Sequence, residues 1–273
     1  MTTTRDPFGL AARVAVVTGG YGVLGAGMAH ELARAGARVA ILGRRLDAAE
    51  KMAAEIRAAG GDAMPLAADV LEREQLVAAR ELVIKRWGAL DILVNAAGGN
   101  VPRARTDGAP VFEMPVDAFD EVVRLNLHGT VLPTLVFAEA MAERGKGCVV
   151  NISSMAAARA LSGVLGYSVA KAAIDNFTRW MAVDLARRYG DQLRVNAVAP
   201  GFFVAAQNRG VLINPDGSFT ERARTIIART PMARFGEPQE LSGVVRFLCS
   251  DAASFITGTV IPVDGGFSAD GGV

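Results

Sequence analysis

Short apolar runs alternate with longer mixed segments along nearly the whole chain. The apolar runs have the length of buried strands and lie at residues 13–17, 38–42, 63–68, 91–95, 147–152, 192–198 and 259–263. The segments between them predict helices at 26–36, 71–87, 116–144 and 238–250, with further helices ending near residues 60, 189 and 229. Strands that alternate with helices of this length form βαβ units. The pattern therefore predicts an α/β fold in which helices cover both faces of a doubly wound parallel sheet.

Local signals set the expected boundaries. Asp47 is the expected N-cap of the second helix. Residues 200–221 are polar and contain glycines, which predicts a loop insertion. We find no linker, charge block or low-complexity segment, so residues 1–273 are expected to form a single domain. Within it, residues 201–229 follow a strand end and are expected to form a small lid over the substrate.

The composition argues against several classes of protein. Lys and Arg number 29 and Asp and Glu number 28, so no basic excess points to a nucleic-acid surface. Cys148 and Cys249 are too few for a disulfide framework, and we expect both to be buried small hydrophobes. His30 and His128 have no ligand-like neighbours, which argues against a metal site. No apolar run reaches membrane-spanning length, so we expect a cytoplasmic protein with no membrane partner.

A glycine-rich turn follows the first predicted strand. Glycines at 19, 20, 22 and 25 let the backbone turn tightly and approach a pyrophosphate. The helix that follows offers free N–H groups and a favourable dipole at its N-terminus. Glycine-rich turns also occur for packing alone, but the strand–loop–helix context favours a dinucleotide site.

The end of the second strand discriminates between the two nicotinamide dinucleotides. Enzymes of this architecture that use NAD usually place an acid there, which bonds the ribose 2′-hydroxyl. Here Gly43 stands at that place and is followed by Arg44 and Arg45, whose guanidinium groups suit a 2′-phosphate. We therefore predict NADP(H) in preference to NAD(H). The alternative is that both arginines are solvated charges before an exposed helix.

Polar and small residues follow the next two strands. Asp69 and Val70 come at the end of the third strand, where a carboxylate and backbone would contact the adenine. Residues 95–98 (NAAG) end the fourth strand, and their small side chains would let the cofactor ribose lie against the backbone. Asn126 lies inside the long helix predicted after that strand. Asparagine is a poor helix-interior residue, so Asn126 either has a functional role or caps a local kink.

Ser154, Tyr167 and Lys171 carry candidate chemistry after the fifth strand. Tyr167 and Lys171 stand one helical turn apart, so on a helix they share a face. A lysine ammonium near a phenol favours the phenolate, which would lower the tyrosine pKa from about 10 toward neutral pH. Ser154 lies on another element, because Gly163 and Gly166 interrupt the run between, and its hydroxyl would hold a carbonyl or alcohol oxygen. The alternative is a surface helix that happens to contain YxxxK.

Taken in order, these motifs resemble the short-chain dehydrogenase/reductase family. The resemblance rests on TGGYGVLG at 18–25, Asp69, NAAG at 95–98, Asn126, Ser154, YSVAK at 167–171 and Pro200-Gly201. The match runs nearly the full chain, and its order and spacing are more specific than any single motif. It implies a Rossmann fold and an NAD(P)-dependent oxidoreductase that acts on CH–OH groups. The chain departs from the usual family pattern at Val23 and Ala96, and at Ala205, where a cofactor-contacting threonine is often found.

The resemblance also implies roles for the site residues. Tyr167 would be the acid/base, Ser154 would hold the substrate oxygen, and Lys171 would bind the nicotinamide ribose and tune the tyrosine. Asn126 would complete a tetrad by supporting a proton-relay water. The cofactor would contact Gly19, Tyr21, Gly22, Val23, Leu24, Gly25, Arg44, Arg45, Asp69, Val70, Asn95, Ala96, Ala97, Gly98, Tyr167, Lys171, Pro200, Gly201 and Phe203. Homo-oligomers are usual in the family, often through the long helices after strands four and five, so a tetramer or dimer is expected.

A narrower resemblance points to a substrate. Motifs similar to the subgroup described as D-mannonate oxidoreductases (fructuronate reductases) occur at residues 22–25, 96–100, 151–155, 200–203, 207–209, 230–238 and 263–269. Members of that subgroup often carry an aspartate where Gly43 stands, which strengthens the expectation of a different cofactor. The small-molecule substrate implied by this resemblance is a keto-sugar acid such as fructuronate.

A sugar acid needs a cation for its carboxylate and polar groups for its hydroxyls. The sequence places such residues in the loops after the strands, at Asn100, Arg103, Arg159, Gln207, Asn208 and Arg209. Arg103 and Arg209 are alternatively solvated loop charges, and Phe202 and Phe203 would either wall an apolar pocket or pack on the nicotinamide. Two other functions stay open, namely the same chemistry on a 3-oxoacyl thioester or cyclic ketone, and a non-catalytic dinucleotide-binding protein. The latter would be expected to lose the tyrosine or lysine of YxxxK, and this chain keeps both.

Overall fold

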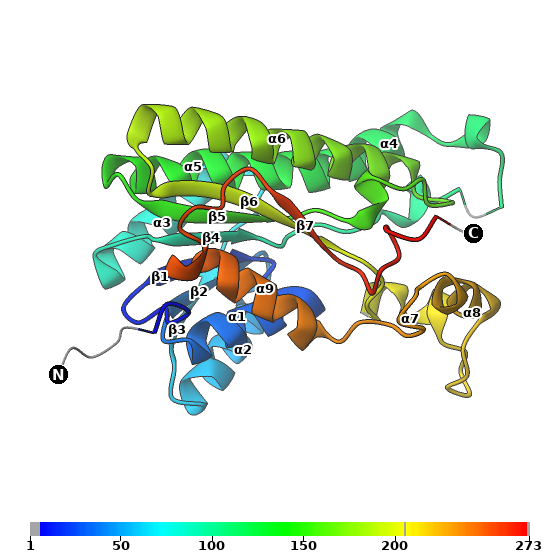
Figure 1. Ribbon diagram of the computed structural model, residues 1–273, viewed down its shortest axis with the longest axis horizontal. Coiled ribbons are helices and arrows are strands. Elements are labelled where there is room, and N and C mark those ends of the chain that lie inside the picture. The colour runs from blue at the N-terminus through cyan, green and yellow to red at the C-terminus, as the bar shows by residue number, and fades with distance from the viewer. Residues whose placement is uncertain (1–5, 107, 205, 272–273) are drawn as a thin grey trace.

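The computed structural model describes residues 6–106, 108–204 and 206–271, apart from the side chains of residues 206 and 207. Within these ranges the strands form one parallel sheet in the order β3-β2-β1-β4-β5-β6-β7 (Figure 1). The strands are β1 (Val14–Thr18), β2 (Arg38–Gly43), β3 (Asp62–Ala67), β4 (Ile92–Asn95), β5 (Gly147–Ile152), β6 (Leu193–Pro200) and β7 (Val260–Val263). The predicted doubly wound α/β fold is therefore confirmed.

The central strands are apolar because both of their faces are covered. Every residue of β1, β4, β5 and β6 is buried, as parallel strands between two helical layers require. The register places Thr18 beside Asn95 and Asn95 beside Asn151, so polar residues collect at the carboxyl ends of neighbouring strands. The strand order reverses between β1 and β4, and sheets of this kind bind ligands beyond the strand ends at such a point.

Helices cover both faces of the sheet (Figure 1). They are α1 (Val23–Arg34), α2 (Leu46–Ala58), α3 (Arg73–Trp87), α4 (Val116–Val123), α5 (Gly129–Glu143), α6 (Leu165–Tyr189), α7 (Ala206–Leu212), α8 (Glu221–Ala228) and α9 (Pro238–Cys249), with short 3-10 turns at Pro102–Ala104, Val111–Glu113, Met155–Ala157 and Asp251–Ala253. One core cluster, with Met28 and Leu241, joins α1, α2 and α9 to the sheet. The other, with Phe137, joins α3, α5 and α6. Cys148 and Cys249 are buried free thiols, as predicted.

Helices α7 and α8 lie away from the sheet, at the right of Figure 1. They pack on each other around a small apolar cluster of Leu212, Ala223 and Ile226. The chain enters them directly from the carboxyl end of β6. A separate small layer therefore stands beside the strand ends where the fold binds its ligands.

Three details of the sequence prediction are wrong. Asp47 is not an N-cap, because Arg45 holds that position and Asp47 lies in the first turn of α2, where its charge suits the helix dipole. Residues 116–144 are not one regular helix, because the π-helical segment Arg124–His128 interrupts it. Residues 206–212 form α7 inside the insertion predicted as a loop. That helix is only about two turns long, too short for periodicity to reveal.

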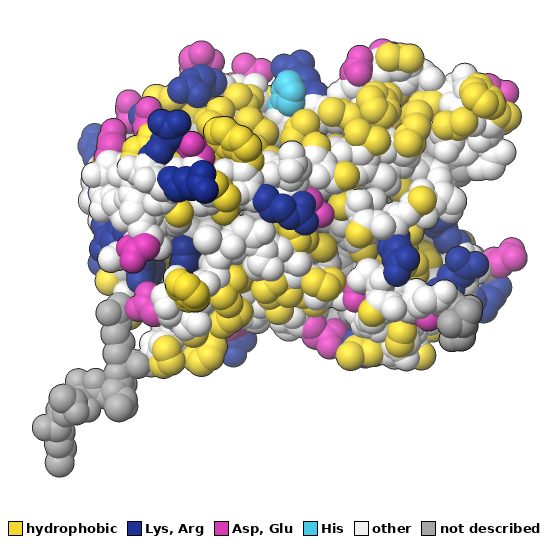
Figure 2. All heavy atoms as spheres, turned by 45° about the horizontal axis from the view of Figure 1, so that its top comes forward, with side chains coloured by type: hydrophobic (Ala, Val, Ile, Leu, Met, Phe, Trp, Pro, Cys, Tyr) yellow, Lys and Arg dark blue, Asp and Glu magenta, His cyan; other side chains and the backbone are white. Residues whose placement is uncertain are grey.

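Exposed apolar side chains gather on the face formed by α4, α5 and α6 (Figure 2). Trp180 is 62% exposed and Val183 50% exposed on α6, and Leu135 is 45% exposed on α5. A run of this size on neighbouring helices is typical of a surface that another protein covers. No helix in the described part of the chain is long and apolar enough to cross a membrane.

Candidate active site

The turn between β1 and α1 forms a backbone cradle. Gly19 has φ +62°, and a Cβ on it would lie 2.9 Å from the Cα of Ala97. A Cβ on Gly25 would lie 2.3 Å from the carbonyl oxygen of Gly19, so α1 packs directly against the turn. Gly22 caps α1 without a side-chain hydrogen bond, and Val23 begins the helix. The helix N-terminus keeps N–H groups available for an anion, so these residues fit a dinucleotide pyrophosphate.

An aromatic ring covers the end of β2. A Cβ on Gly43 would lie 2.4 Å from the ring of Tyr21, so the ring rests on the glycine. The Tyr21 hydroxyl accepts a hydrogen bond from the backbone N–H of Arg45 at 3.2 Å, and the Arg45 guanidinium lies 5.2 Å from the ring centroid. Arg44 and Arg45 are both exposed. Two guanidinium groups, and no carboxylate at position 43, therefore flank the strand end where this fold binds an adenosine ribose.

Asp69 and Val70 follow β3. The Asp69 carboxylate accepts a hydrogen bond from the backbone N–H of Leu71 at 3.0 Å, which fixes its direction. Val70 is buried, and a Cβ on Gly129 would lie 3.1 Å from it, so Val70 packs on the start of α5. Asp69 thus offers a fixed carboxylate at the strand end, whereas the side chain of Val70 serves the core.

Buried hydrogen bonds join the ends of β1, β4 and β5. The hydroxyl of Thr18 accepts from the backbone N–H groups of Ala96 and Ala97, both at 3.1 Å. Asn95 donates to the side-chain oxygen of Asn151 at 2.9 Å. The side chain of Asn95 therefore holds the strand ends together. Its Oδ1 is buried without a hydrogen-bond partner in the protein, and its contact with the cofactor stays a prediction.

Asn126 lies in the middle of the π-helical segment and is fully buried. Its side-chain amide donates to the carbonyl oxygens of Gly99 at 2.7 Å and Val122 at 2.8 Å, and its Oδ1 accepts from the Gly99 N–H at 3.1 Å. These bonds tie the helix to the loop after β4. A Cβ on Gly98 would lie 2.7 Å from Asn126 Oδ1 and 3.7 Å from Lys171 Nζ, so the three residues meet at one point. π-Segments of this kind occur frequently at functional sites.

Lys171 is a buried cation behind the tyrosine. Its Nζ donates to the carbonyl oxygen of Ile152 at 2.7 Å and lies 5.4 Å from the centroid of the Tyr167 ring. Burial lowers the pKa of Lys171 to about 8, and the charge of Asp175 acts in the opposite direction. Ser153 donates a hydrogen bond to the Asp175 carboxylate and so fixes that counter-charge.

Ser154 and Tyr167 meet in front of the lysine. Burial raises the pKa of Tyr167 above its ordinary value, and a hydrogen bond with Ser154 offsets this only in part. The prediction that Lys171 brings the tyrosine pKa toward neutral is therefore wrong for the chain by itself. Desolvation of a phenolate here outweighs an ammonium 5.4 Å from the ring. Tyr167 accordingly keeps its proton, as a general acid must.

A cavity of about 260 Å³, which we call the catalytic cavity, opens at these two hydroxyl groups. Ser154 and Tyr167 line one side of it, near the end of β5 and the start of α6. The segment that follows β6 supplies the opposite side, where Phe202 and Phe203 form an apolar wall. The predicted cofactor residues Leu24, Pro200 and Gly201 also line the cavity. Residues from the cofactor cradle and from the candidate catalytic set therefore share one cavity.

The structure separates the predicted substrate residues. Asn100 and Asn208 line the catalytic cavity, and Asn208 also donates to the carbonyl oxygen of Phe203 at 2.8 Å. The side-chain oxygen Oδ1 of Asn100 is buried without a hydrogen-bond partner in the protein, which marks it as a group that a ligand would satisfy. The side chain of Gln207 lies outside the described residues.

The predicted arginines point elsewhere. Arg159 is exposed, and its guanidinium donates to the carbonyl oxygen of Ser268 near the end of the chain. Arg209 is exposed on α7 and is not among the described residues that line the catalytic cavity. Arg103 forms a surface ion pair with Asp117 at 2.7 Å. None of the three reaches the cavity.

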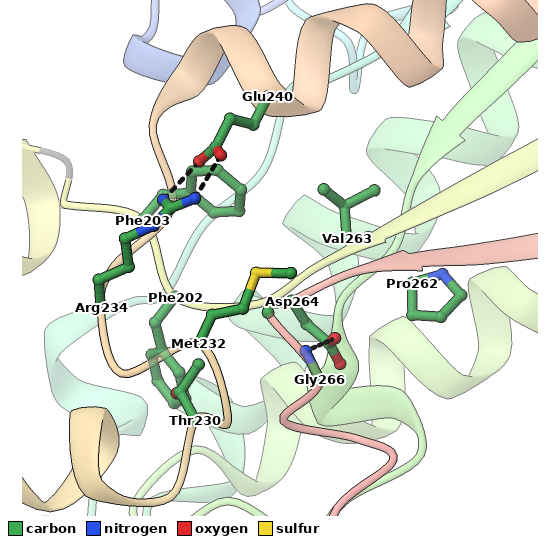
Figure 3. Close-up of a pocket in the computed structure, with 12 residues that line it drawn as sticks. Phe202, Phe203, Thr230, Met232, Arg234, Glu240, Pro262, Val263, Asp264 and Gly266 are labelled. Atoms are coloured by element: carbon green, nitrogen blue, oxygen red, sulfur yellow. Dashed lines mark hydrogen bonds and ion pairs between the residues drawn. The ribbon is translucent and has the colours of Figure 1, made fainter.

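A second cavity, of about 330 Å³, lies behind the aromatic wall (Figure 3). Phe202 and Phe203 line both cavities. The Arg234 guanidinium in the second cavity points at Glu240 and bonds both carboxylate oxygens, at 2.8 Å and 2.6 Å. This bond lowers the pKa of Glu240 to about 2. The charge of Arg234 is therefore already neutralised within the protein.

Sequence reasoning missed two arginines that do line the catalytic cavity. Arg105 comes from the loop after β4, and Arg222 comes from the first turn of α8. Neither belongs to a motif, and no spacing distinguishes them from the other basic residues of the chain. Ser153 and Asp175, which support the lysine, were also missed, although the second hydroxyl in Ser153-Ser154 was a signal.

The fold and the site together define a nicotinamide-dependent oxidoreductase. A family model described as Enoyl-(Acyl carrier protein) reductase matches residues 22–268. A protein of Bacillus subtilis (strain 168) named Uncharacterized oxidoreductase UxuB is 46% identical, over 97% of this chain and 98% of its own. The chain belongs to the short-chain dehydrogenase/reductase family and is an NAD(P)-dependent enzyme acting on CH–OH groups.

Solved structures agree with this assignment. A structure from Haemophilus influenza, described as a candidate D-mannonate oxidoreductase with bound NAD, has a TM-score of 0.91 and 41% identity, covering 97% of this chain and 98% of that one. A gluconate 5-dehydrogenase from Burkholderia cenocepacia J2315, in complex with NADP and tartrate, has a TM-score of 0.87 and 34% identity with the same coverage. The neighbours thus include proteins that bind either dinucleotide.

Proposed function

We propose that this protein is an NADP(H)-dependent carbonyl reductase or alcohol dehydrogenase that interconverts a keto-sugar acid and its alcohol, with fructuronate and mannonate as the first pair to test. The observation that carries the proposal is the meeting of Ser154 and Tyr167 at the catalytic cavity, with the Lys171 ammonium 5.4 Å from the phenol ring. A hydroxyl, a phenol and a buried cation are the groups that carbonyl reduction needs to hold the oxygen and to move one proton.

The nicotinamide, when bound, supplies or takes up the hydride. The residues of the chain handle the oxygen and the proton. Ser154 donates a hydrogen bond to the carbonyl oxygen, and Tyr167, which burial keeps protonated, delivers its proton to that oxygen. In the reverse direction Tyr167 takes the proton from the alcohol, and the nearby Lys171 ammonium stabilises the phenolate. Asn126 holds the loop at Gly99 in place beside them.

Replacing Tyr167 with phenylalanine tests this mechanism. Tyr167→Phe should lower kcat by about 10²- to 10⁴-fold, because the proton donor is lost while the ring stays. The Kd for NADPH, measured by fluorescence titration, should stay within about twofold of wild type, a factor worth less than about 0.5 kcal/mol. Tyr189→Phe makes the same change at the exposed end of α6 and is the matched control. Near-normal turnover by Tyr167→Phe would remove the tyrosine from the mechanism.

The preference for NADP(H) is also a proposal. It is supported by Gly43, which leaves no acid for a 2′-hydroxyl, and by the exposed guanidinium groups of Arg44 and Arg45. Steric conditions at the strand end agree, since the Tyr21 ring occupies the space into which a side chain at position 43 would project. The bound NAD of the Haemophilus influenza structure favours the other dinucleotide, whereas the NADP of the gluconate 5-dehydrogenase favours this one.

Kinetics with the two cofactors decide between them. Wild type should show a higher kcat/KM with NADPH than with NADH. The double variant Arg44→Gln/Arg45→Gln should lose about tenfold or more in kcat/KM with NADPH, because each charged hydrogen bond is worth about 1.5–3 kcal/mol. NADH, which lacks the 2′-phosphate, is the internal control and should change little. A wild type that uses NADH more efficiently than NADPH would contradict the assignment.

The proposed substrate rests on several lines of support. The narrow sequence resemblance and the names of two structural neighbours point to sugar acids. The catalytic cavity, at about 260 Å³, suits a small molecule better than a long acyl chain. The apolar wall of Phe202 and Phe203 favours the alternative, a cyclic ketone or a 3-oxoacyl thioester. Steady-state rates over hexuronates, cyclic ketones and acyl thioesters distinguish these classes.

Three further proposals follow from the surface and the sequence. Residues 201–229, which carry α7 and α8, act as a lid over the catalytic cavity. The apolar face of α4, α5 and α6 joins copies of the chain into a dimer or tetramer (Figure 2). The enzyme works in the cytoplasm. Light scattering measures the oligomer, and Trp180→Glu on that face should reduce its size.

A further inference from the structure

Arg222 lies where three cavities meet. It lines the catalytic cavity with Tyr167, a cavity of about 430 Å³ with Arg105, and an outer cavity of about 1120 Å³ with Arg159. It is half-buried, whereas its neighbour Glu221, which lines only the outer cavity, is exposed. The Arg222 side chain therefore stands between the candidate catalytic groups and the solvent.

The bonds that hold the Arg222 guanidinium within the protein are weak. Its two terminal nitrogens donate to the hydroxyl and carbonyl oxygens of Ser162, both at 3.5 Å, the outer limit of a hydrogen bond. It forms no ion pair with any carboxylate among the described residues. Arg234 in the second cavity differs, because Glu240 bonds it at two points (Figure 3). Of these two arginines, Arg222 is the one whose charge a ligand would neutralise.

The backbone that carries Arg222 is nevertheless fixed. Thr220 caps α8 by accepting from the Ala223 N–H at 3.2 Å, and its hydroxyl donates to the carbonyl oxygen of Val211 at 2.8 Å. Ala223 and Ile226 are buried in the apolar cluster shared with α7. Only the side chain of Arg222 therefore needs to move for it to meet a ligand.

The charged side chains described along the catalytic cavity are basic. Arg105 and Arg222 line it, and no Asp or Glu is found among the described residues that do so. The loop that carries Arg105 is joined to the loop before Tyr167 by a hydrogen bond from the Thr106 N–H to the Gly163 carbonyl oxygen at 3.2 Å. A half-buried guanidinium group with only weak bonds to the protein, such as that of Arg222, attracts an anion more strongly than an exposed one does.

We propose that Arg222 binds the carboxylate of the substrate and thereby restricts the enzyme to small carbonyl compounds that carry an anionic group. The planar fork of arginine matches a carboxylate at two points. Ser154 and Tyr167, which would hold the reacting oxygen, line the same cavity as Arg222. The substrate would therefore carry its carboxylate and its carbonyl in one small molecule. This inference rests on the proposed function and names the group by which the substrate is recognised.

The test compares anionic and neutral substrates in matched variants. Two pairs serve, fructuronate with fructose and 4-oxopentanoate with 2-pentanone, all with saturating NADPH. Arg222→Gln should lose about 10- to 100-fold in kcat/KM on the anionic member, mainly through KM, because charged hydrogen bonds are lost. The neutral member should change by less than about threefold, a transition-state difference below about 0.7 kcal/mol. Arg222→Lys, which keeps the charge without the fork, should fall between wild type and Arg222→Gln.

The control variant is Arg224→Gln, which removes the same charge from the same helix. Arg224 is exposed and donates to the carbonyl oxygen of Phe219 at 2.7 Å, and it is not among the described residues lining the catalytic cavity. Its kcat/KM should therefore stay within about twofold of wild type on both members of a pair. A twofold change is smaller than the loss of one substrate hydrogen bond would cause. Melting temperatures of all variants report whether the fold is intact.

Two results would overturn the inference. One is an equal loss on anionic and neutral substrates in Arg222→Gln, and the other is a wild type that prefers the neutral member of both pairs. A wild type that reduces 4-oxopentanoate but not fructuronate would instead reject the proposed sugar-acid substrate. In that case the comparison of 4-oxopentanoate with 2-pentanone alone would decide whether Arg222 binds the substrate carboxylate.

Discussion

The two sides of the catalytic cavity are held in different ways. The catalytic wall, with Ser154 and Tyr167, lies at the end of β5 and the start of α6. Buried hydrogen bonds fix the polar groups next to it, such as the 2.7 Å bond from Lys171 to the carbonyl oxygen of Ile152. The outer wall consists of residues 201–229, and its arginine, Arg222, has hydrogen bonds of only 3.5 Å within the protein. The catalytic wall is therefore preorganised, whereas the outer wall has hydrogen-bond donors on Arg222 that a ligand can still use.

The difference follows from what each wall has to do. Proton and hydride transfer depend on positions held within fractions of an ångström, since a misplacement of about 1 Å can cost about 10²-fold in rate. Recognition of a substrate charge needs donors that are not yet satisfied when the substrate arrives. The buried network around Asn126 serves the first purpose, and the weakly bonded Arg222 serves the second.

The largest expected effect comes from overpacking the catalytic wall. Gly98 has φ +151°, and a Cβ there would lie 2.7 Å from Asn126 Oδ1 and 3.7 Å from Lys171 Nζ. Gly98→Ala should therefore cost about 2–5 kcal/mol in the free energy of unfolding, from strain and overpacking together. It should also lower kcat/KM by about 10²-fold or more, because Asn126 must shift beside the catalytic groups. Urea unfolding and steady-state kinetics measure the two effects.

A glycine of the outer wall provides the control. Gly217 has φ +86°, but a Cβ on it would meet nothing within 4 Å. Gly217→Ala should cost only about 1 kcal/mol of backbone strain and leave kcat nearly unchanged. If both alanine variants lost activity to the same degree, the outer wall would be as tightly preorganised as the catalytic wall, and the contrast between them would be false.

The catalytic wall is also the part that sequence predicts well. Tyr167 and Lys171 are one helical turn apart, and the glycines after β1 stand at fixed spacings, so regular elements place them without further information. The π-segment at Asn126 is different. The apolar pattern of residues 116–144 is continuous, and one wider turn does not change it enough to be seen. The predicted direction of the Tyr167 pKa shift was wrong, because the sequence shows the neighbouring lysine charge but not the burial of the phenol.

The cations of the outer wall could not be predicted, although Asn208 and the two phenylalanines were, because long-range packing decides which arginines reach the cavity. Sequence reasoning chose Arg159 and Arg209 from loops near the strand ends. The structure turns Arg159 to Ser268, which is far away along the chain, and leaves Arg209 exposed. Arg222 reaches the cavity only because α8 packs on α7 around a shared apolar cluster. No local pattern encodes that contact.

A smaller expected effect is the pH dependence of stability that the buried Lys171 of the catalytic site causes. Burial lowers the pKa of Lys171 from 10.5 to about 8, so between these values the unfolded chain holds a proton here that the folded chain has released. The contribution of Lys171 to the free energy of unfolding must therefore rise as pH rises from about 8 toward 10.5, and protonated Lys171 lowers stability below about 8.

Replacing Lys171 with methionine removes this pH dependence. Relative to wild type, Lys171→Met should lose about 2 kcal/mol of unfolding free energy between pH 7 and pH 10, since each pKa unit is worth about 1.4 kcal/mol. Urea unfolding at both pH values, with the exposed Lys85→Met as control, measures the difference. If the unfolding free energies of wild type and Lys171→Met changed in parallel between pH 7 and pH 10, burial of the ammonium would not destabilise the fold. The preorganised catalytic wall would then carry no loss of stability at Lys171.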